Sequence, residues 1–478
     1  MYRRKMTGLL AVGLACSLLA GCGGKKTALD PDRPVKVTVW DYYTGAQMES
    51  FHELVTEFNR TRGKELGIVV DDSSEGGISD LETNVMAAIN KEAGARDVPN
   101  MFAVYSDTAY KVYQMGELVD LSEYLTEEER AEYVDSYIEE GAFDKEGEMM
   151  LFPVAKATEI FFLNKTDWDK FSRATGADME KLKTIEGVAE IAEAYYEWTD
   201  SLTDEPEDGK AFFGRDSLGN YMLSGAWQLG GDILTRDPSG KVTVHFDEEI
   251  IRKLWDYYYV PYVKGYFASA GRFRSDDVKT GSIVSFVGSS AGATFFPKEV
   301  ILENDESYPI ETVVMEAPQF ADNEKCAIQQ GAGIAVTKGS EAEIEASVEF
   351  LKWFTDTQQN LRFAVASGYL PVKKEANDME EIRKTGSLSS QVDSVMQVAV
   401  DTMNSYRLIS VLPFARSAEV RNLLEDSMQE KAETDRAAVE AEIAAGKSRE
   451  EAAAQYDTDE NFRSWYEEMT AALAVYAQ

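Results

Sequence analysis

Short apolar runs alternate with helically spaced apolar residues along the first 115 residues. Residues 35–40 form a short apolar run behind Pro34, which is typical of a buried strand. In residues 47–62 apolar side chains recur every three or four positions, which predicts an amphipathic helix with Met48, Phe51, Leu54, Val55 and Phe58 on its apolar face. The same alternation predicts strands at 67–70 and 99–104 and helices at 80–91 and 107–115.

This order of elements predicts a parallel sheet covered by helices. Alternating strands and helices are typical of α/β proteins, because each helix returns the chain to the same edge of the sheet. Ligands of such sheets bind beyond the carboxyl ends of the strands. We therefore expect functional side chains in residues 41–44 and 105–107, which follow the first and third strands.

Beyond residue 150 the pattern is less regular. Extended segments at 151–154 and 159–164 lead out of the first unit, and further strands are predicted at 283–287, 310–315 and 332–337. Helices are predicted near 185–200 and 248–262 and from 342 onward, and the Ala/Glu-rich residues 428–455 read as a solvated helical pair. No internal repeat or long linker separates these parts. We therefore expect two interwoven lobes, with the chain crossing between them more than once.

The N-terminus predicts export. Three basic residues at positions 3–5 precede an apolar run at 9–20, which is too short to span a bilayer and matches a secretory signal. The run ends in Leu19-Ala20-Gly21-Cys22, which resembles the lipobox of bacterial lipoproteins. This resemblance implies removal of residues 1–21 and anchoring to the lipid bilayer, on its extracytoplasmic face, through acylated Cys22. Residues 22–34 are then a flexible tether; a plain signal peptide with an incidental cysteine is the alternative.

Charge and composition exclude several classes of protein. The chain has 478 residues, with 48 Lys and Arg against 85 Asp and Glu and a formal charge of −37, which opposes binding to nucleic acid. Two histidines leave no room for a multi-His metal centre, and no cofactor is expected. Cys16 leaves with the signal and Cys22 takes the lipid, so Cys326 stands alone without a disulfide partner and reads as a strand-entry residue.

Several segments, in a fixed order between residues 35 and 375, resemble the extracellular solute-binding proteins of ABC importers, the family that includes maltose- and glycerol-3-phosphate-binding proteins. They are Val37-Thr38-Val39-Trp40, Leu151-Phe152-Pro153, Phe161-Phe162-Leu163-Asn164-Lys165, Trp227-Gln228-Leu229-Gly230-Gly231-Asp232, Gly281-Ser282-Ile283-Val284, Gly331-Ala332-Gly333-Ile334-Ala335-Val336 and Gly368-Tyr369-Leu370-Pro371, the last preceded by a helix at 346–355. Each piece alone is a weak signal, but the ordered set is a strong one.

The resemblance implies a periplasmic-binding-protein-like α/β fold, in which two lobes joined by hinge strands close on a ligand and pass it to a membrane permease. We expect lobe 1 to comprise 35–153 and 281–318, and lobe 2 to comprise 154–280 and 319–478. Gly331 and Gly333 are expected to allow close backbone approach at a hinge or beside the ligand. The chain is expected to act as a monomeric receptor and not as an enzyme.

Some motifs are similar to the glycerol-3-phosphate-binding branch of that family. They are the Ser-rich loop Gly288-Ser289-Ser290-Ala291-Gly292, Tyr369 in Gly-Tyr-Leu-Pro, and Leu412-Pro413-Phe414 followed by Arg416. Other positions depart from that branch. Gly76-Gly77-Ile78-Ser79 stands where the branch has a ligand tyrosine, Ser106 and Asp107 stand where it has a glutamate, and Arg416 is out of register.

Sugar recognition needs flat apolar faces for the ring and fixed polar groups for its hydroxyls. Aromatic residues beside the predicted strands supply the faces, although such residues also pack into cores. Carboxylate, hydroxyl and amide side chains supply hydrogen bonds, and a Ser-rich turn with converging N–H groups can cradle an anion or a hydroxyl. The candidate ligand-binding residues are Asp41, Tyr42, Ser106, Asp107, Trp227, Gln228, Ser289, Ser290, Tyr369 and Arg416.

The charge around these loops favours a neutral ligand. Carboxylates match sugar hydroxyls but repel phosphate, and the evident basic partners are only Lys156 and Arg416. We therefore expect a neutral oligosaccharide, with glycerol-3-phosphate or a sugar phosphate as the alternative. With 85 carboxylates in the chain, a secreted glycan-processing enzyme with two facing acids is the rival class, and a lipid-anchored scaffold is a third interpretation.

Overall fold

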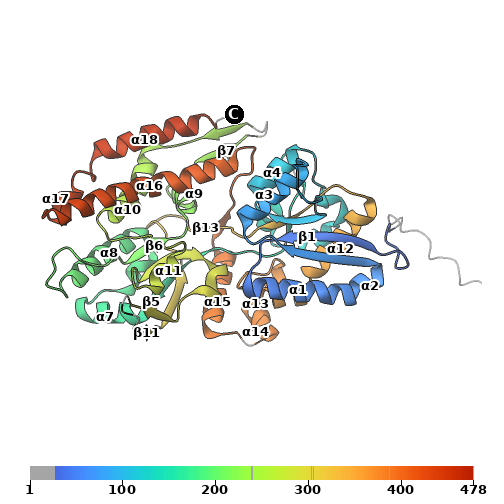
Figure 1. Cartoon of the computed structure of the whole chain (residues 1–478), viewed down its shortest axis with the longest axis horizontal. Coiled ribbons are helices and arrows are strands. Elements are labelled where there is room, and N and C mark those ends of the chain that lie inside the picture. Colours follow the sequence, from blue (N-terminus) through green and yellow to red (C-terminus); the bar gives the residue numbers. More distant parts are fainter. Residues whose placement is uncertain are drawn as a thin grey trace, which may run out of the picture.

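The computed structural model describes residues 27–145, 147–237, 241–302, 304, 306–386 and 388–476. The expected signal peptide and its lipid-attachment residue, Cys22, lie outside these residues. Two α/β bodies lie side by side, each built around its own sheet (Figure 1). The predicted α/β fold of two lobes is therefore confirmed.

The first lobe contains a five-stranded sheet in the order β2–β1–β3–β14–β4. β1 pairs in parallel with both β2 and β3, as the sequence predicted, whereas β14 runs antiparallel to β3 and β4. The strands are β1 Val35–Asp41, β2 Ile68–Ser74, β3 Met101–Val104, β4 Phe152–Pro153 and β14 Gly333–Val336.

Helices cover both faces of this sheet. α1 (Gly45–Arg60) buries Phe51, Leu54, Val55 and Phe58, as the helical spacing predicted, while Met48 is exposed. The other helices of this lobe are α2 Arg62–Leu66, α3 Ile78–Ile89, α4 Ser106–Gln114, η1 Leu121–Tyr124, α5 Glu127–Ala131, α6 Asp135–Glu139, α12 Glu341–Phe354, α13 Thr357–Ser367, η4 Lys374–Ala376 and α14 Met379–Thr385.

The second lobe contains a four-stranded sheet in the order β12–β5–β9–β6. β5 is its second strand and pairs antiparallel with both β12 and β9. The strands are β5 Glu159–Asn164, β6 Phe213–Arg215, β9 Ser285–Ser289 and β12 Thr312–Glu316. Every residue of β5 is buried, so this strand lies in the core of the lobe.

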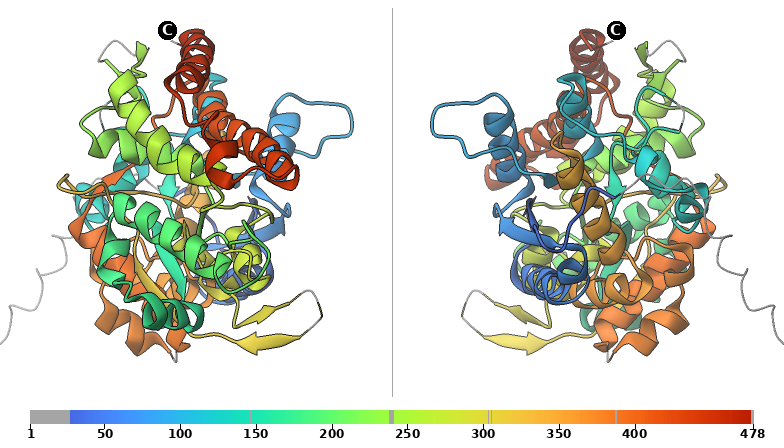
Figure 2. Two further views of the ribbon diagram at one scale, coloured as in Figure 1. Left: turned by 90° about the vertical axis from the view of Figure 1, so that its left-hand side faces the viewer. Right: turned by 90° about the vertical axis from the view of Figure 1, so that its right-hand side faces the viewer.

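The helices of the second lobe come from both the middle and the end of the chain. They are α7 Lys165–Thr175, η2 Met179–Lys183, α8 Ile185–Asp200, α9 Leu218–Gln228, α10 Glu248–Val263, α11 Arg274–Lys279, η3 Ser290–Phe295, α15 Ser390–Ser405, α16 Ser417–Ala444, α17 Arg449–Ala453 and α18 Asp459–Ala474. The C-terminal helices lie together on one side of the molecule (Figure 2). α16 packs against α9 and α10 along a buried face, so the segment predicted as a solvated pair is only partly solvated.

Two short hairpins complete the second lobe. β7 (Leu234–Arg236) pairs with β8 (Val242–Val244), and β10 (Glu299–Ile301) pairs with β11 (Ser307–Pro309). The β10–β11 hairpin projects from the body of the protein (Figure 2). Among the described residues, none of the helices is long and apolar enough to cross a membrane.

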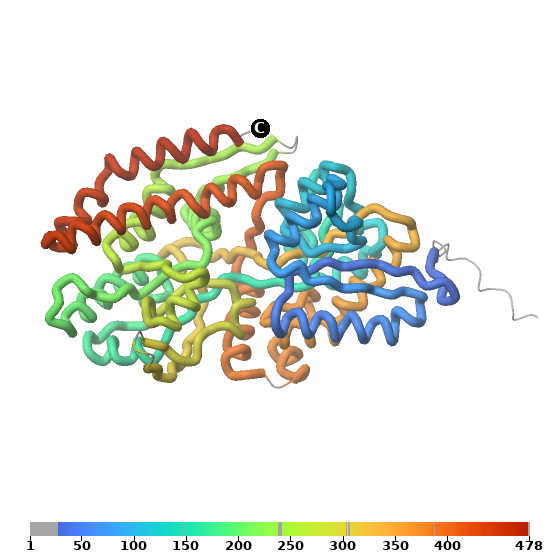
Figure 3. The backbone as a smooth tube through the Cα atoms, in the orientation of Figure 1, coloured from blue at the N-terminus to red at the C-terminus, as the bar shows by residue number. Residues whose placement is uncertain are grey.

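The chain crosses between the lobes several times (Figure 3). Residues 154–158 lead from β4 to β5, and β13 (Cys326–Ile328) lies on the return path from β12 to β14. β13 pairs in parallel with β15 (Arg407–Ile409), which lies between α15 and α16. Ala157 and Gln330 exchange backbone hydrogen bonds of 3.0 and 2.8 Å. These adjacent extended segments form the expected hinge strands.

The sheets divide the chain differently from the expected lobe boundaries. Residues 281–318 were expected in lobe 1, but β9 and β12 pair with β5 in the second sheet. Residues 319–478 were expected in lobe 2, but β14 pairs with β3 and β4 in the first sheet. Each of these pairs joins strands more than 100 residues apart. Hydrophobic periodicity indicates how a segment is buried but not which distant strand it pairs with. It therefore could not predict which lobe β9, β12 and β14 belong to.

Candidate ligand-binding site

A cavity of about 190 Å³ lies between the two lobes, beside the hinge strands. The first lobe contributes Tyr105, Ser106, Asp107 and Glu140. The hinge contributes residues 328–331, and the second lobe contributes Ser217, Asn220, Val411 and Arg421. Its lining combines hydroxyl, amide, carboxylate and guanidinium groups with one tyrosine ring and the aliphatic side chains of Ile328 and Val411.

The first-lobe wall follows directly from one βα unit. β3 ends at Val104, Tyr105 is extended, and α4 begins at Ser106, so these residues lie at the carboxyl end of a parallel strand. Asp107 is buried, and its Oδ1 accepts a hydrogen bond of 2.7 Å from the Thr108 backbone N–H. Its Oδ2 accepts one of 3.1 Å from Arg421 Nε, so an ion pair joins the two lobes across the cavity.

The second-lobe wall combines the start of α9 with α16. The Glu425 carboxylate from α16 accepts hydrogen bonds from Ser217 Oγ at 2.6 Å, Leu218 N at 2.9 Å and Gly219 N at 2.8 Å. These contacts satisfy N–H groups that have no partner inside the helix. They also fix α16 against α9, which places Arg421, one turn earlier on α16, at the cavity.

A buried ion pair supports this wall from behind. Asn220 Nδ2 donates to Glu159 Oε1 at 3.0 Å, and Arg215 Nη2 donates to Glu159 Oε2 at 2.9 Å. All three side chains are buried. Burial raises the pKa of Glu159, while the Arg215 charge opposes that rise. Arg215 Nε has no hydrogen-bond partner in the described part of the chain.

The hinge wall presents acceptors that are not satisfied. Lys156, only 1% exposed, donates to Glu140 Oε2 and, at 2.9 Å, to Gly331 O. Gln329 Nε2 donates to the same Glu140 oxygen at 2.6 Å. The Oε1 atoms of Gln329 and Gln330 find no partner among the described residues.

Gly331 allows this close packing at the hinge. Its φ is +93°, and a Cβ atom there would lie 2.5 Å from Ala155 O. A side chain would therefore be both strained and obstructed. The prediction that Gly331 serves close backbone approach is confirmed. A Cβ atom at Gly333 would likewise lie 3.0 Å from the Leu151 Cβ.

The remaining first-lobe candidates are not among the residues that line the cavity. Tyr42 and Tyr369 are not among the lining residues, and their hydroxyl groups are 3.1 Å apart. The Asp41 carboxylate is buried and accepts a hydrogen bond of 2.9 Å from Tyr43 N. Burial raises the pKa of Asp41 to about 7. Asp41 is the last residue of β1, and the rings of Tyr42 and Tyr369 lie against that of Tyr43.

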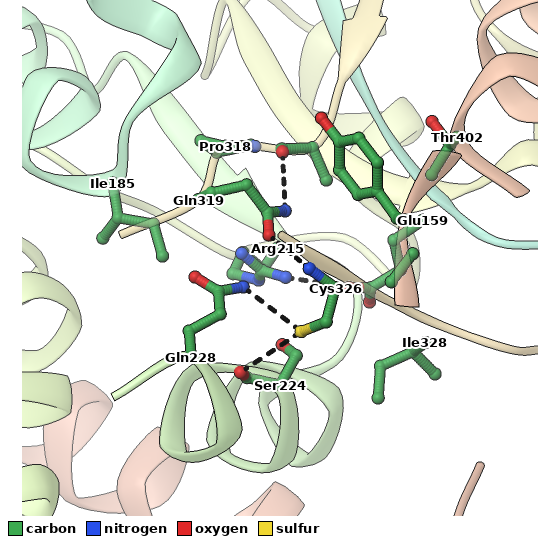
Figure 4. A pocket seen from close by; sticks show the side chains of 13 residues that line it. Glu159, Ile185, Arg215, Ser224, Gln228, Pro318, Gln319, Cys326, Ile328 and Thr402 are labelled. Atoms are coloured by element: carbon green, nitrogen blue, oxygen red, sulfur yellow. Dashed lines mark hydrogen bonds and ion pairs between the residues drawn. The ribbon is translucent and has the colours of Figure 1, made fainter. Parts of the chain in front are cut away.

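The Gln228 side chain makes its hydrogen bonds inside the second lobe. Its Oε1 accepts from Phe320 N at 2.7 Å, and its Nε2 lies 3.6 Å from Cys326 Sγ. Figure 4 shows Gln228 and Ser224 of α9 pointing toward Cys326 in a small pocket of about 20 Å³, enough for one water molecule. Burial raises the pKa of the Cys326 thiol to about 12, which keeps it protonated, and β13 begins at this residue as predicted.

Trp227 lies at the other end of α9 from the cavity. It lines a separate groove of about 380 Å³ together with Gly230, Gly231 and Asp232. The Arg407 guanidinium lies 5.1 Å from the centre of its ring. The structure therefore places Trp227 and the Ser217–Asn220 wall in two different depressions of the second lobe.

The Ser-rich loop and Arg416 also lie away from the cavity lining. Ser289 Oγ accepts from Ala291 N at 3.4 Å at the start of η3, and buried Ser290 accepts from Thr158 N at 3.2 Å. These serines fix the hinge segment locally. Arg416 forms an exposed ion pair of 2.6 Å with Glu419.

Of the ten candidate residues, the cavity lining contains Ser106 and Asp107. Sequence reasoning did not single out Glu140, Ser217, Asn220, Gln329 or Arg421. Gln329 had one usable signal, because it lies three residues before the predicted strand at 332–337. Arg421 had none, because a charged residue in a polar helix is typical of a solvated surface. Among the described residues, no group of three or more His, Cys, Asp or Glu side chains could hold a metal ion.

Comparison with known proteins identifies what this fold resembles. Residues 53–388, more than half of the chain, match the bacterial extracellular solute-binding protein family. Among curated proteins, none matches this sequence.

Solved structures share the fold at low sequence identity. The cyclic alpha-maltosyl-1,6-maltose binding protein from Arthrobacter globiformis is 20% identical, covers 91% of this chain and 100% of its own, and gives a TM-score of 0.64. UgpB from Mycobacterium tuberculosis, in complex with glycerophosphocholine, is 19% identical, with coverages of 92% and 99% and a TM-score of 0.65. An ABC substrate-binding protein from Listeria monocytogenes, in complex with cycloalternan, is 14% identical, with coverages of 92% and 99% and a TM-score of 0.65.

Proposed function

Because the chain belongs to the bacterial extracellular solute-binding protein family, we propose that it is the receptor of an ABC importer and captures a neutral carbohydrate between its lobes. Membership of a family of solute receptors supports binding and delivery rather than glycan processing. The ligand would pass to a permease in the membrane. Acylated Cys22 would anchor the receptor to the same membrane.

The main observation in favour of a neutral ligand is that every charged group at the cavity is paired with a group of opposite charge. Arg421 pairs with Asp107, Lys156 with Glu140, and Arg215, behind the wall, with Glu159. A phosphate group would have to share one of these cations with the carboxylate that already neutralises it, and would meet the repulsion of that carboxylate. A neutral ligand leaves all three pairs intact.

The polar lining fits hydroxyl groups. The Gln329 and Gln330 side chains line the cavity, Ser106 offers a hydroxyl, and Tyr105 offers a flat face for a sugar ring. Two of the similar structures bind saccharides, by their own descriptions: cyclic alpha-maltosyl-1,6-maltose and cycloalternan. They are consistent with a carbohydrate ligand here.

Glycerol-3-phosphate or a sugar phosphate is the second candidate. The similarity in fold to UgpB, which was solved with glycerophosphocholine, favours it. The paired cations of the cavity oppose it, since no guanidinium or ammonium group there is without a carboxylate partner among the described residues.

A thermal-shift screen of the mature protein tests the ligand class. The compounds are neutral oligosaccharides, their monosaccharides, sugar phosphates, glycerol-3-phosphate and glycerophosphocholine. A ligand present at about 100 times its Kd adds about 2.7 kcal/mol to stability, which gives a measurable rise in Tm. We expect stabilisation by neutral saccharides. Stabilisation by phosphorylated compounds alone would show that the neutral class is wrong, and release of a shortened product would show an enzyme.

The anchor has its own test. Cys22→Ala should leave the precursor unprocessed or release the protein from the membrane fraction, because no acyl chain can be attached. Cys326→Ala is the matched control, since this buried thiol has no part in anchoring. Normal processing and membrane retention of Cys22→Ala would contradict the lipid anchor.

A further inference from the structure

An anion already occupies the N-terminus of α9. Three donors converge on the Glu425 carboxylate, namely Ser217 Oγ and the backbone N–H groups of Leu218 and Gly219, at 2.6–2.9 Å. Glu425 comes from α16, more than 200 residues further along the chain. Converging N–H groups at the start of a helix bind phosphate or carboxylate groups well, because the helix dipole adds to the hydrogen bonds. We call these three donors the α9 cradle.

The α9 cradle belongs to the wall of the ligand cavity. Ser217 lines the cavity, as does Asn220 in the first turn of α9 and Arg421 one turn before Glu425 on α16. The backbone is shaped for close contact with the carboxylate, since a Cβ atom on Gly219 would lie 3.0 Å from Glu425 Oε2. The cradle is thus built to hold an anion, and the chain itself supplies that anion.

A second feature of the cavity lining opposes an anionic ligand group. The carboxylates of Asp107 and Glu140 both line the cavity. Each is already paired with a cation, Arg421 and Lys156 respectively, so among the described residues the lining offers no unpaired positive charge.

We propose that Glu425 is a specificity-determining residue, which fills the α9 cradle and so excludes anionic ligand groups from the second-lobe wall of the cavity. This inference rests on the proposed function in that the cavity is the ligand site. An incoming phosphate finds the three donors occupied and meets the negative charge of Glu425. A hydroxyl-bearing neutral ligand meets no such repulsion.

Removal of the carboxylate should therefore create a phosphate site. In Glu425→Ala the three donors lose their acceptor, so the variant should have a lower Tm than the wild type in chloride buffer. Inorganic phosphate should restore part of that loss. By calorimetry, we expect Glu425→Ala to bind phosphate at least about tenfold more tightly than the wild type, since charge-assisted hydrogen bonds are strong. Chloride at matched ionic strength provides the reference for every titration.

Two further variants keep the experiment decisive. Glu430→Ala removes an equal charge from an exposed position on the same helix and should behave as the wild type. Glu425→Gln keeps the side-chain volume but places an amide NH₂ group among the donors, so it should also gain phosphate affinity, and it serves if Glu425→Ala does not fold. Equal phosphate binding by the wild type and both Glu425 variants would overturn the proposal, as would an equal gain in Glu430→Ala.

The outcome is separable from that of the carbohydrate proposal, because inorganic phosphate tests the α9 cradle without any saccharide present. A phosphate gain without any saccharide binding would uphold the α9 cradle and remove the carbohydrate. Saccharide binding without a phosphate gain would uphold the carbohydrate and reduce Glu425 to a helix-capping residue.

Discussion

The two walls of the ligand cavity are assembled in different ways. The first-lobe wall comes from a single βα unit, in which β3 leads through Tyr105 into α4. The second-lobe wall joins α9 and α16, whose contact depends on Glu425 and on the buried pair behind Asn220. The geometry of the first wall is therefore set by adjacent residues, and that of the second by tertiary contacts across 200 residues. The second wall should be the more sensitive to loss of a buried charge.

Arg215→Met should have the largest effect on stability. It removes the guanidinium that neutralises Glu159, and both side chains are buried, so the free energy of unfolding should fall by about 3–5 kcal/mol at pH 7. Urea denaturation followed by circular dichroism measures this. Arg383→Met, which breaks an exposed pair with Asp393, is the matched control and should cause no measurable loss.

The pH dependence identifies the cause of that loss. Burial already raises the pKa of Glu159, and without Arg215 the folded-state pKa rises further above the unfolded value. A raised carboxyl pKa means that stability is lost as pH rises and recovered as pH falls. The deficit of Arg215→Met should therefore shrink toward acidic pH. A deficit that is equal at pH 5 and pH 8 would point to lost packing instead of a buried charge.

Asp41→Asn, in the first lobe, should raise stability, whereas Arg215→Met, in the second lobe, should lower it. The pKa of Asp41 is about 7, above its ordinary value of 3.8, because the group is buried. The folded protein therefore holds this proton more tightly than the unfolded chain, and stability falls as pH rises from about 4 to 7. Asparagine carries no charge and can keep the acceptor for Tyr43 N.

We expect Asp41→Asn to raise the free energy of unfolding by about 2–4 kcal/mol at pH 8 and to leave it unchanged at pH 4. Denaturation curves at the two pH values measure the difference. Asp71→Asn, an exposed carboxylate on the neighbouring strand β2, is the control. A destabilised Asp41→Asn at pH 8 would mean that the ionised carboxylate is required in the first lobe.

The same contrast explains how much the sequence could predict. The order β1–α1–β2–α3–β3–α4 follows from hydrophobic periodicity, and the strand-end rule points directly to Ser106 and Asp107. The sequence could not predict which sheet β9, β12 and β14 join, because antiparallel pairing of distant strands leaves no local pattern. Arg421 and Glu425 look like surface charges until α16 is placed against α9.

Tyr105→Ala and Trp227→Ala compare the cavity with the groove at the other end of α9. Tyr105 lines the cavity, and loss of its ring should weaken binding of the saccharide found in the screen by about 1–3 kcal/mol, or 5- to 150-fold. Trp227 lines the separate groove, so its loss should change affinity less than about twofold. Calorimetry measures both. A larger loss in Trp227→Ala would place the saccharide in the groove.

Arg416→Ala should have the smallest effect and makes the sharpest distinction between ligand classes. Its guanidinium is exposed, pairs with Glu419 at 2.6 Å, and lies 4.1 Å from the centre of the Tyr476 ring. An exposed pair of this kind contributes little, so Tm should shift by no more than about 1 °C. Arg421, five residues later, lines the cavity and pairs with Asp107, so Arg421→Ala should weaken ligand binding while Arg416→Ala leaves it unchanged. If Arg416→Ala instead abolished binding, an anionic ligand contacting Arg416 would have to replace the neutral saccharide, because a neutral ring in the cavity cannot depend on a cation outside it.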